Sequence, residues 1–347
     1  MIYHFTHYGP EGYKDILERL ERLERLMSVL DMFFMVSGIL IFVHYRDRIT
    51  SPQSYADYIV RRFVRIYPLH LITLAFFVVL AVAGKLGVLN ITAVSRYDLS
   101  QTPANLLLVQ GWSFSKELSL NYVSWSMSAE WFCYLLLPVI VYCFRTSGTP
   151  GLVLLLAGYL VFLESLTYSG IMPFSSWMSA DTWGAWRAFA DFIAGALIAS
   201  AAMESRLKLK SHWPAWIMMA VAITTMQMKT PPYFSYFLIA IALYLAAICE
   251  RNAPPSAKWL DVLGPAASVS FGIYMWHPVI ETVTYQVLWP RIFQPMGINF
   301  YVFLLAPIAL TIITEFISYN FFEKWAGRKL EGAIGYRSAR TKAAPAE

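Results

Sequence analysis

Apolar residues run through this 347-residue chain in stretches long enough to cross a bilayer. A membrane-spanning helix needs about 17–25 predominantly apolar residues, and such stretches recur from end to end. The pattern predicts an all-α polytopic membrane bundle of about ten transmembrane helices, the first of which, residues 1–8, is truncated. The nine other spans are expected at about 29–45, 63–83, 125–144, 151–168, 185–203, 213–227, 233–250, 267–289 and 300–322.

One short segment has a different periodicity. Between Ile16 and Leu26, leucine recurs at every third position, and a glutamate is twice followed by an arginine four residues later. Such i, i+4 pairs of opposite charge stabilise a helix. We therefore predict an amphipathic helix lying on the bilayer surface. A short coiled-coil contact is the alternative.

Composition supports a chain embedded in a membrane over almost all of its length. It is 58% hydrophobic and only 14% charged, whereas a soluble domain has about 25% charged residues. We expect one membrane-embedded domain over residues 1–325 and a basic cytoplasmic tail over 326–347, which is expected to be disordered. The three cysteines, Cys133, Cys143 and Cys249, all lie in apolar segments, so we expect buried thiols and neither disulfides nor zinc ligands.

Basic residues are distributed unevenly over the connections between the predicted spans. Most of the 27 Lys and Arg residues fall on one side, in the 46–65 linker, in the alternate loops that follow, and in the C-terminal tail. Basic connections mark the cytoplasmic side. We therefore expect a multi-pass protein of the cell inner membrane, with a cytoplasmic C-terminus and with residues 84–124 as a mostly polar outer connection. The net charge of +5 reports this orientation and does not indicate nucleic-acid binding.

Three ionisable residues should lie at one depth near the outer face. His4 is at the end of the first span, Asp31 begins the second, and Glu130 lies about one turn into the fourth. An ionised side chain inside a span costs at least about 2.5–3.5 kcal/mol, so such residues are expected to have partners and commonly a function. A histidine beside a carboxylate is the usual general-base arrangement. We predict that His4, Glu130 and Asp31 are catalytic; the alternative is an interfacial histidine with structural carboxylates.

Two further groups could bind ligands. Arg62 and Arg65 are three residues apart, hence on one helical face, and planar guanidinium groups suit phosphate oxygens. Ordinary positive-inside anchoring is the alternative. Tyr274 and His277 share a face in the ninth predicted span, next to Pro278, and either contribute to a substrate site or form a structural kink. The sequence has no Walker loop and no His-Glu-x-x-His motif, and no metal site is expected.

Five motifs follow one another in a fixed order. They occupy residues 3–5, 31–38, 61–68, 125–131 and 274–278, and read Tyr-His-Phe, Asp-Met-Phe-Phe-Met-Val-Ser-Gly, Arg-Arg-Phe-Val-Arg-Ile-Tyr-Pro, Trp-Ser-Met-Ser-Ala-Glu-Trp and Tyr-Met-Trp-His-Pro. With this ordered set the chain resembles the acyltransferase-3 family of integral membrane acyltransferases, which O-acylate carbohydrates. The resemblance covers about the whole chain.

The resemblance implies a ten-span bundle in which acyl-CoA, most of all acetyl-CoA, donates from the cytoplasm to a carbohydrate hydroxyl on the outer side. No tightly bound cofactor is implied. His4 matches the family's catalytic histidine, Arg62 and Arg65 match its Arg-x-x-Arg pair, and Glu130 matches the carboxylate of its Trp-Ser-x-x-x-Glu segment. The family's first span usually carries an arginine that would here precede Met1. Either the start is set too late, or the chain lacks this group and would be inactive.

The leading hypothesis is therefore a membrane O-acyltransferase that moves an acetyl or other short acyl group onto a cell-surface or exported polysaccharide or glycolipid. Its partners would be acyl-CoA, the carbohydrate acceptor and the lipid bilayer, and not nucleic acid. Trp125, Ser128, Tyr274 and His277 are expected to line the substrate site. The alternatives are a carrier or flippase for a lipid-linked sugar or small solute, with a His/carboxylate relay, and a structural membrane component.

Overall fold

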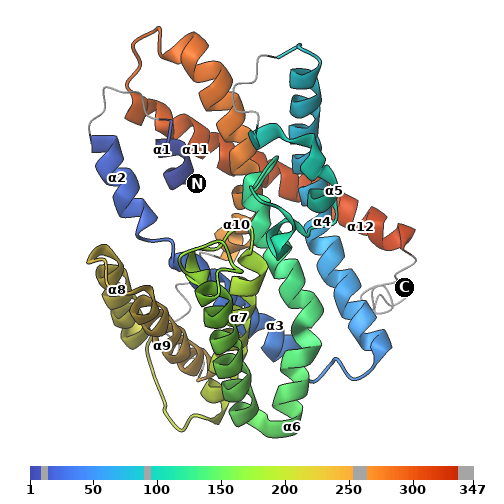
Figure 1. Cartoon of the computed structure of the whole chain (residues 1–347), viewed down its shortest axis with the longest axis vertical. Coiled ribbons are helices and arrows are strands. Elements are labelled where there is room, and N and C mark those ends of the chain that lie inside the picture. The colour runs from blue at the N-terminus through green and yellow to red at the C-terminus, as the bar shows by residue number, and fades with distance from the viewer. Residues whose placement is uncertain (9–14, 90–94, 253–263, 335–347) are drawn as a thin grey trace, which may run out of the picture.

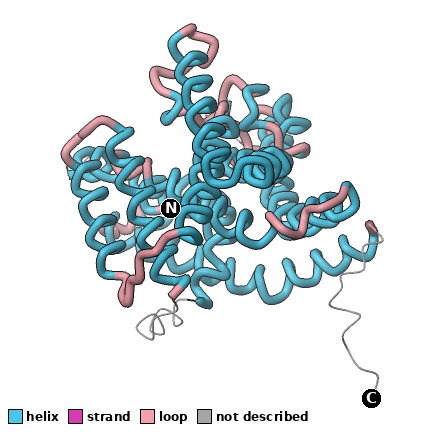
Figure 2. The backbone as a smooth tube through the Cα atoms, turned by 90° about the horizontal axis from the view of Figure 1, so that it is seen from below, coloured by secondary structure: helices cyan, strands magenta, loops and turns pink. Residues whose placement is uncertain are grey.

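The computed structural model describes residues 1–8, 15–89, 95–252 and 264–334, and every regular element in these ranges is a helix (Figures 1 and 2). Six helical segments of this described part are long and apolar enough to cross a membrane. They are Glu18–Tyr45, Pro52–Lys85, Tyr122–Tyr168, Gly184–Glu204, Pro232–Arg251 and Phe300–Ala333. The predicted all-α, multi-pass membrane bundle is confirmed, whereas the count of ten spans stays a prediction.

The predicted spans coincide with helices of the structure. The bundle helices are α3 (Val29–Tyr45), α4 (Pro52–Lys85), α6 (Trp125–Tyr168), α7 (Gly184–Glu204), α8 (Trp213–Gln227), α9 (Pro232–Arg251), α10 (Gly264–Glu281) and α11 (Phe300–Ile317). The ninth and tenth predicted spans end in π-helical turns, η7 (Thr282–Phe293) and η8 (Ser318–Glu323). The first predicted span contains only the five-residue helix α1 (Ile2–Thr6).

The long helix α6 contains two predicted spans. At Gly148 the backbone leaves the helical conformation, with φ 60° and ψ −150°. Phe132 and Tyr159 lie on either side of this break, and a straight helix would separate them by about 40 Å. Both rings nevertheless lie close to the ring of Phe189, with centroids at 6.0 and 5.1 Å. The chain therefore reverses at Gly148, and the two halves of α6 form a helical hairpin (Figure 1).

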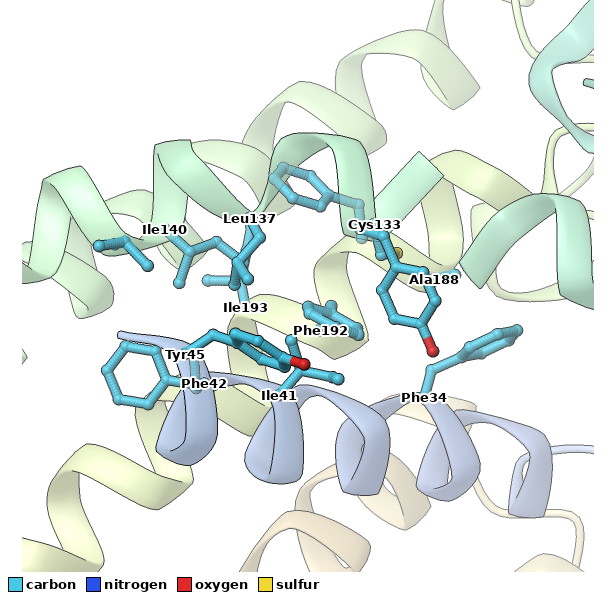
Figure 3. Close-up of a cluster of buried hydrophobic side chains, with 14 of the residues drawn as sticks. Phe34, Ile41, Phe42, Tyr45, Cys133, Leu137, Ile140, Ala188, Phe192 and Ile193 are labelled. Atoms are coloured by element: carbon cyan, nitrogen blue, oxygen red, sulfur yellow. The ribbon is translucent and has the colours of Figure 1, made fainter. Parts of the chain in front are cut away.

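Helix α7 is the centre of the bundle because it packs against α3, α6 and α9 at once. Its neighbours approach very closely: a Cβ on Gly38 would lie 2.5 Å from the carbonyl oxygen of Phe192, and one on Gly195 would lie 2.2 Å from that of Met35. Small residues permit such contacts between membrane helices. Glycine at position 38 thus lets α3 and α7 pack backbone against backbone. Around this crossing, aromatic and aliphatic side chains of α3, α6 and α7 form one core (Figure 3).

The predicted surface helix is present as α2 (Asp15–Glu24), and both i, i+4 ion pairs form. Arg22 lies 2.5 Å from Glu18, and Arg25 lies 2.9 Å from Glu21. Lys229, in the turn between α8 and α9, also contacts Glu21 at 2.8 Å. Helix α2 is therefore tied to the α8–α9 turn, and its position on a bilayer surface stays a prediction.

Two connections differ from expectation. The 84–124 connection, called the outer connection after the side on which we expect it, folds into the short helices η1 (Ser95–Tyr97), η2 (Leu99–Gln101), α5 (Thr102–Leu106), η3 (Gln110–Phe114) and η4 (Tyr122–Ser124). Several of its polar residues, such as Gln110 and Asn121, are buried, so it belongs to the fold and is no solvated loop. The tail, expected to be disordered from residue 326, is helical as α12 (Lys324–Ala333), and residues 335–347 lie outside the described residues. Cys133 and Cys249 are buried thiols as expected, whereas Cys143 is half-buried.

Candidate active site

His4 and Glu130 line the same cavity, which has a volume of about 440 Å³. Its wall comes from α1, from the turn between α2 and α3, from the first turns of α3, from η4 and the start of α6, and from α10. Most of the wall is apolar or aromatic, and few polar side chains reach it. Trp125 and Tyr274, both predicted for the substrate site, also line this cavity.

His4 is held between two aromatic neighbours. Its imidazole stacks on that of His277, with ring centroids 5.2 Å apart and planes inclined by 27°. The ring of Tyr122 meets it edge-on at 5.1 Å. The adjacent Phe5 is fully buried, against the rings of His277 and Tyr285. One face of His4 is thus covered by protein, while its side chain still reaches the cavity.

His277 lies behind His4 and does not itself line the cavity. Its Nδ1 is 2.7 Å from the carbonyl oxygen of Tyr274, three residues earlier on the same face of α10. A carbonyl oxygen only accepts, so Nδ1 carries the hydrogen and Nε2 keeps its lone pair. Nε2 is buried and has no hydrogen-bond partner within the described residues. His277 therefore acts on the cavity through its contact with His4.

Glu130 meets two hydroxyl groups. Its Oε1 accepts hydrogen bonds from the hydroxyl of Ser37, at 3.2 Å, and from that of Tyr134, at 2.5 Å. Ser37 comes from α3 and Tyr134 lies one turn further along α6. These bonds satisfy one oxygen of a carboxyl group that is only 8% exposed. Because both bonds go to Oε1, Oε2 keeps its capacity to accept from a ligand hydroxyl.

The predicted arginine pair is connected to Glu130 through Tyr134. The guanidinium of Arg62 lies over the rings of Tyr45 and Tyr134, at 5.5 and 5.8 Å, and donates to the hydroxyl of Tyr45 at 3.2 Å. Arg65 follows on the same face of α4 and is exposed. Tyr134 therefore has its ring against an arginine and its hydroxyl on the cavity carboxylate. Arg62, predicted for the cytoplasmic side, and Glu130, predicted for the outer side, thus both contact Tyr134.

Asp31 is placed apart from His4 and Glu130. It is fully buried, and one of its oxygens accepts from Nε of Arg187 in α7 at 2.7 Å. Asp191, one turn further along α7, influences the same guanidinium electrostatically but forms no ion pair with it. The three residues, which were expected at one depth, thus do not all line one cavity. The structure brings His4 and Glu130 together and leaves Asp31 as the partner of an arginine.

Ser128 also lies outside the cavity wall. Its hydroxyl donates to the carbonyl oxygen of Leu108 at 2.7 Å and accepts from the amide of Gly111 at 3.1 Å. It thereby fastens the outer connection to α6. Trp125 lines the cavity and also packs against the start of α7. A Cβ added to Gly184 would lie only 2.2 Å from its ring.

A second polar cluster around His4 was missed by the sequence analysis. Glu281 is 1% exposed and binds Arg96 at 2.8 Å together with the hydroxyls of Tyr8 and Tyr122. A signal for Glu281 did exist, because it lies four residues after His277 inside a predicted span. Arg96 and Tyr8 had none, since only the tertiary fold brings them to this carboxylate.

The arrangement can perform acid–base chemistry on a hydroxyl. An imidazole that reaches a cavity can take a proton, and a nearby carboxyl group can orient a polyhydroxy ligand. The exposed guanidinium of Arg65 and the neighbouring Arg62 can bind an anionic ligand such as a phosphate.

Comparison with known proteins gives one match. The family model described as an acyltransferase domain, acyltransferase-3, matches residues 1–319. This range includes every cavity-lining residue and both arginines. No curated protein and no solved structure matches the chain.

Proposed function

The chain belongs to the acyltransferase-3 family of membrane acyltransferases, and on this premise we propose that it moves an acetyl or other short acyl group from acyl-CoA to a carbohydrate hydroxyl. The observation that carries the proposal is that His4 and Glu130, from helices far apart in the sequence, line one cavity. A base and a hydroxyl-orienting carboxyl group are what O-acylation needs.

In the proposed reaction His4 is the general base. Its imidazole takes the proton of the acceptor hydroxyl while the oxygen attacks the carbonyl carbon of the thioester. The new acyl–oxygen bond forms and the acyl–sulfur bond breaks. The CoA sulfur leaves as a thiolate and takes up the proton from the imidazolium, so the products are an ester and a thiol. A neutral imidazole suits both transfers because its free ring nitrogen can accept a proton and give it up again.

Glu130 is proposed to orient the acceptor. A sugar hydroxyl can replace the hydroxyl of Ser37 as a donor to its Oε1. Such an exchange conserves the number of hydrogen bonds and leaves no buried charge unpaired. Asp31 is assigned a structural role, because its contact is the ion pair with Arg187.

Arg62 and Arg65 are proposed to bind the CoA phosphates from the cytoplasmic side. Bidentate guanidinium–phosphate contacts are strong and directional. Arg65 is exposed and Arg62 is half-buried. In this proposal the exposed guanidinium of Arg65 binds the soluble donor, and Arg62, which lies over the ring of Tyr134, guides the acyl group past that ring.

The test is transfer of labelled acetyl from acetyl-CoA to glycan in vesicles that contain the purified full chain. We expect His4→Ala to lower transfer by about 10²–10⁴-fold, the usual contribution of a general base. His7→Ala is the matched control, because His7 is an exposed histidine directly after α1 and does not line the cavity. Unchanged transfer by His4→Ala would remove His4 from the mechanism.

A second arm tests the donor site. Arg65→Ala should raise KM for acetyl-CoA and leave KM for the acceptor unchanged, while the neighbouring Arg61→Ala serves as control. Movement of a solute without any donor, and no label on glycan, would instead indicate a carrier.

A further inference from the structure

The position of His4 needs an explanation from outside its own helix. Helix α1 has five residues, and a helix this short is unstable without tertiary contacts. Phe5 supplies an apolar anchor, since it is fully buried. An apolar contact keeps a side chain buried but does not set its direction. A base that must face a cavity also needs directional contacts.

Glu281 of α10 supplies such contacts to three other elements. Its Oε1 accepts from the hydroxyl of Tyr8, just after α1, at 2.8 Å and lies 2.8 Å from Nη2 of Arg96 in η1. Its Oε2 accepts from the hydroxyl of Tyr122 in η4 at 2.8 Å. Arg96 also donates to the hydroxyl of Tyr8 at 2.8 Å. One buried carboxylate thus joins the end of α1 to the outer connection and to α10.

These bonds determine what surrounds the imidazole. The ring of Tyr122 touches His4 edge-on, and its hydroxyl is fixed by Glu281, so the ring cannot turn away. The guanidinium of Arg96 lies 5.1 Å over the same ring. His277, one turn before Glu281 on α10, stacks on the imidazole. A single helix therefore sets both aromatic neighbours of His4.

We propose that Glu281 is the positioning residue for His4, acting through the hydroxyls of Tyr8 and Tyr122. This inference rests on the proposed acyl transfer, in which His4 is the base. Glu281 does not line the cavity and touches no reacting atom. Its effect is on the approach of the imidazole, for which a misplacement of about 1 Å can cost about 100-fold in rate.

Two conservative variants test the positioning. Tyr122→Phe keeps the ring against His4 and removes its bond to Glu281. Tyr8→Phe, at a residue outside the cavity wall, removes the bond to Glu281 together with the bonds that the Tyr8 hydroxyl accepts from Arg96 and Gln286. Each leaves Glu281 its ion pair with Arg96. We expect each variant to lower kcat by about 10-fold while KM for acetyl-CoA stays unchanged. A purely structural role would lower the yield of folded protein and leave kcat per folded molecule at its normal value.

Tyr97→Phe is the matched control. The hydroxyl of Tyr97 donates to Oε1 of Gln286 at 3.1 Å, beside the same cluster, without touching Glu281 or His4. Its removal should leave kcat unchanged. Glu281→Gln is a harsher variant, because it leaves the guanidinium of Arg96 without its carboxylate, and it is measured only for comparison.

A second readout does not depend on activity. Hydrogen–deuterium exchange at the imidazole C2 of His4, followed by mass spectrometry, should become at least about twofold faster in Tyr122→Phe and Tyr8→Phe, because the ring contacts loosen. Tyr97→Phe should match the native chain. If the native chain transfers acyl groups and both variants keep native kcat and exchange, the inference is wrong and the proposed function stands. If the native chain transfers nothing, the proposed function fails, and exchange alone decides the positioning.

Discussion

The buried ion pair between Arg187 and Asp31 allows a quantitative prediction. Nε of Arg187 lies 2.7 Å from Asp31 Oδ1, and the two side chains are only 4% and 0% exposed. Removal of one partner from a buried pair leaves an uncompensated charge and costs about 3–5 kcal/mol. Arg187→Met keeps most of the side-chain volume and removes the charge. We therefore expect this substitution to lower the free energy of unfolding by about 3–5 kcal/mol.

Substitution of the acidic partner, Asp31→Asn, should lower the free energy of unfolding by less. Asp191 lies four residues after Arg187 on α7 and interacts electrostatically with the same guanidinium, although the two side chains form no ion pair, so Asp31→Asn leaves the arginine one carboxyl group nearby. The amide oxygen of the new asparagine can still accept from Nε. What is lost is the difference between a charged and a neutral acceptor, about 1–2 kcal/mol. The structure thus predicts that Arg187→Met lowers the free energy of unfolding more than Asp31→Asn does.

Reversible unfolding in mixed micelles, with increasing sodium dodecyl sulfate and tryptophan fluorescence as the signal, measures both costs. The double variant Asp31→Asn/Arg187→Met should lose less free energy of unfolding than the two single variants lose together, because the two residues are in contact. The reasoning is refuted if Arg187→Met stays within about 1 kcal/mol of the native chain, or if Asp31→Asn is the more costly change. Native transfer per folded molecule in Asp31→Asn would support the structural role, and a large loss of kcat at native stability would make Asp31 catalytic.

Two further substitutions test the packing and the surface. Gly195→Ala would place a Cβ 2.2 Å from the carbonyl oxygen of Met35, so α3 and α7 must separate, and the same titration should show a loss of about 1–3 kcal/mol. Glu21→Gln removes the charge that pairs with Lys229 at the surface and should leave the unfolding free energy close to that of the native chain; a clear loss would show that the contact between α2 and the α8–α9 turn is essential for the fold.

The helices were predictable because their signal is local. Long apolar runs between polar connections place α3 and α8 at the residues expected, 29–45 and 213–227. The outer connection was not predictable in this way. Its polar residues are buried because the tertiary fold satisfies them: the amide of Asn121 donates to the carbonyl oxygen of Met275, and the carbonyl oxygen of Asn105 contacts Nε2 of His70. Such partners lie on other elements, and a pattern within one segment cannot show them.

The sequence singles out the ionisable residues of the site, but not the direction in which each side chain points. The cost of an ionisable group in an apolar run singles out His4, Asp31 and Glu130, and orientation assigns them a common level. Which way each points depends on the rotation of its helix, which is set by packing against neighbouring helices. Asp31 turns toward α7 and meets Arg187, whereas Glu130 turns toward the cavity.

Three buried carboxyl groups in this bundle are satisfied in different ways, and the difference bears on which of them can serve the proposed reaction. Asp31 and Glu281 each bind an arginine, and exchange of such a partner for a neutral sugar hydroxyl would leave a buried guanidinium unpaired, at a cost of several kcal/mol. Glu130 binds the hydroxyls of Ser37 and Tyr134. A substrate hydroxyl can replace one of them at almost no cost in hydrogen bonding. Of the three, Glu130 is thus the carboxyl group that can bind and release an acceptor in each catalytic cycle.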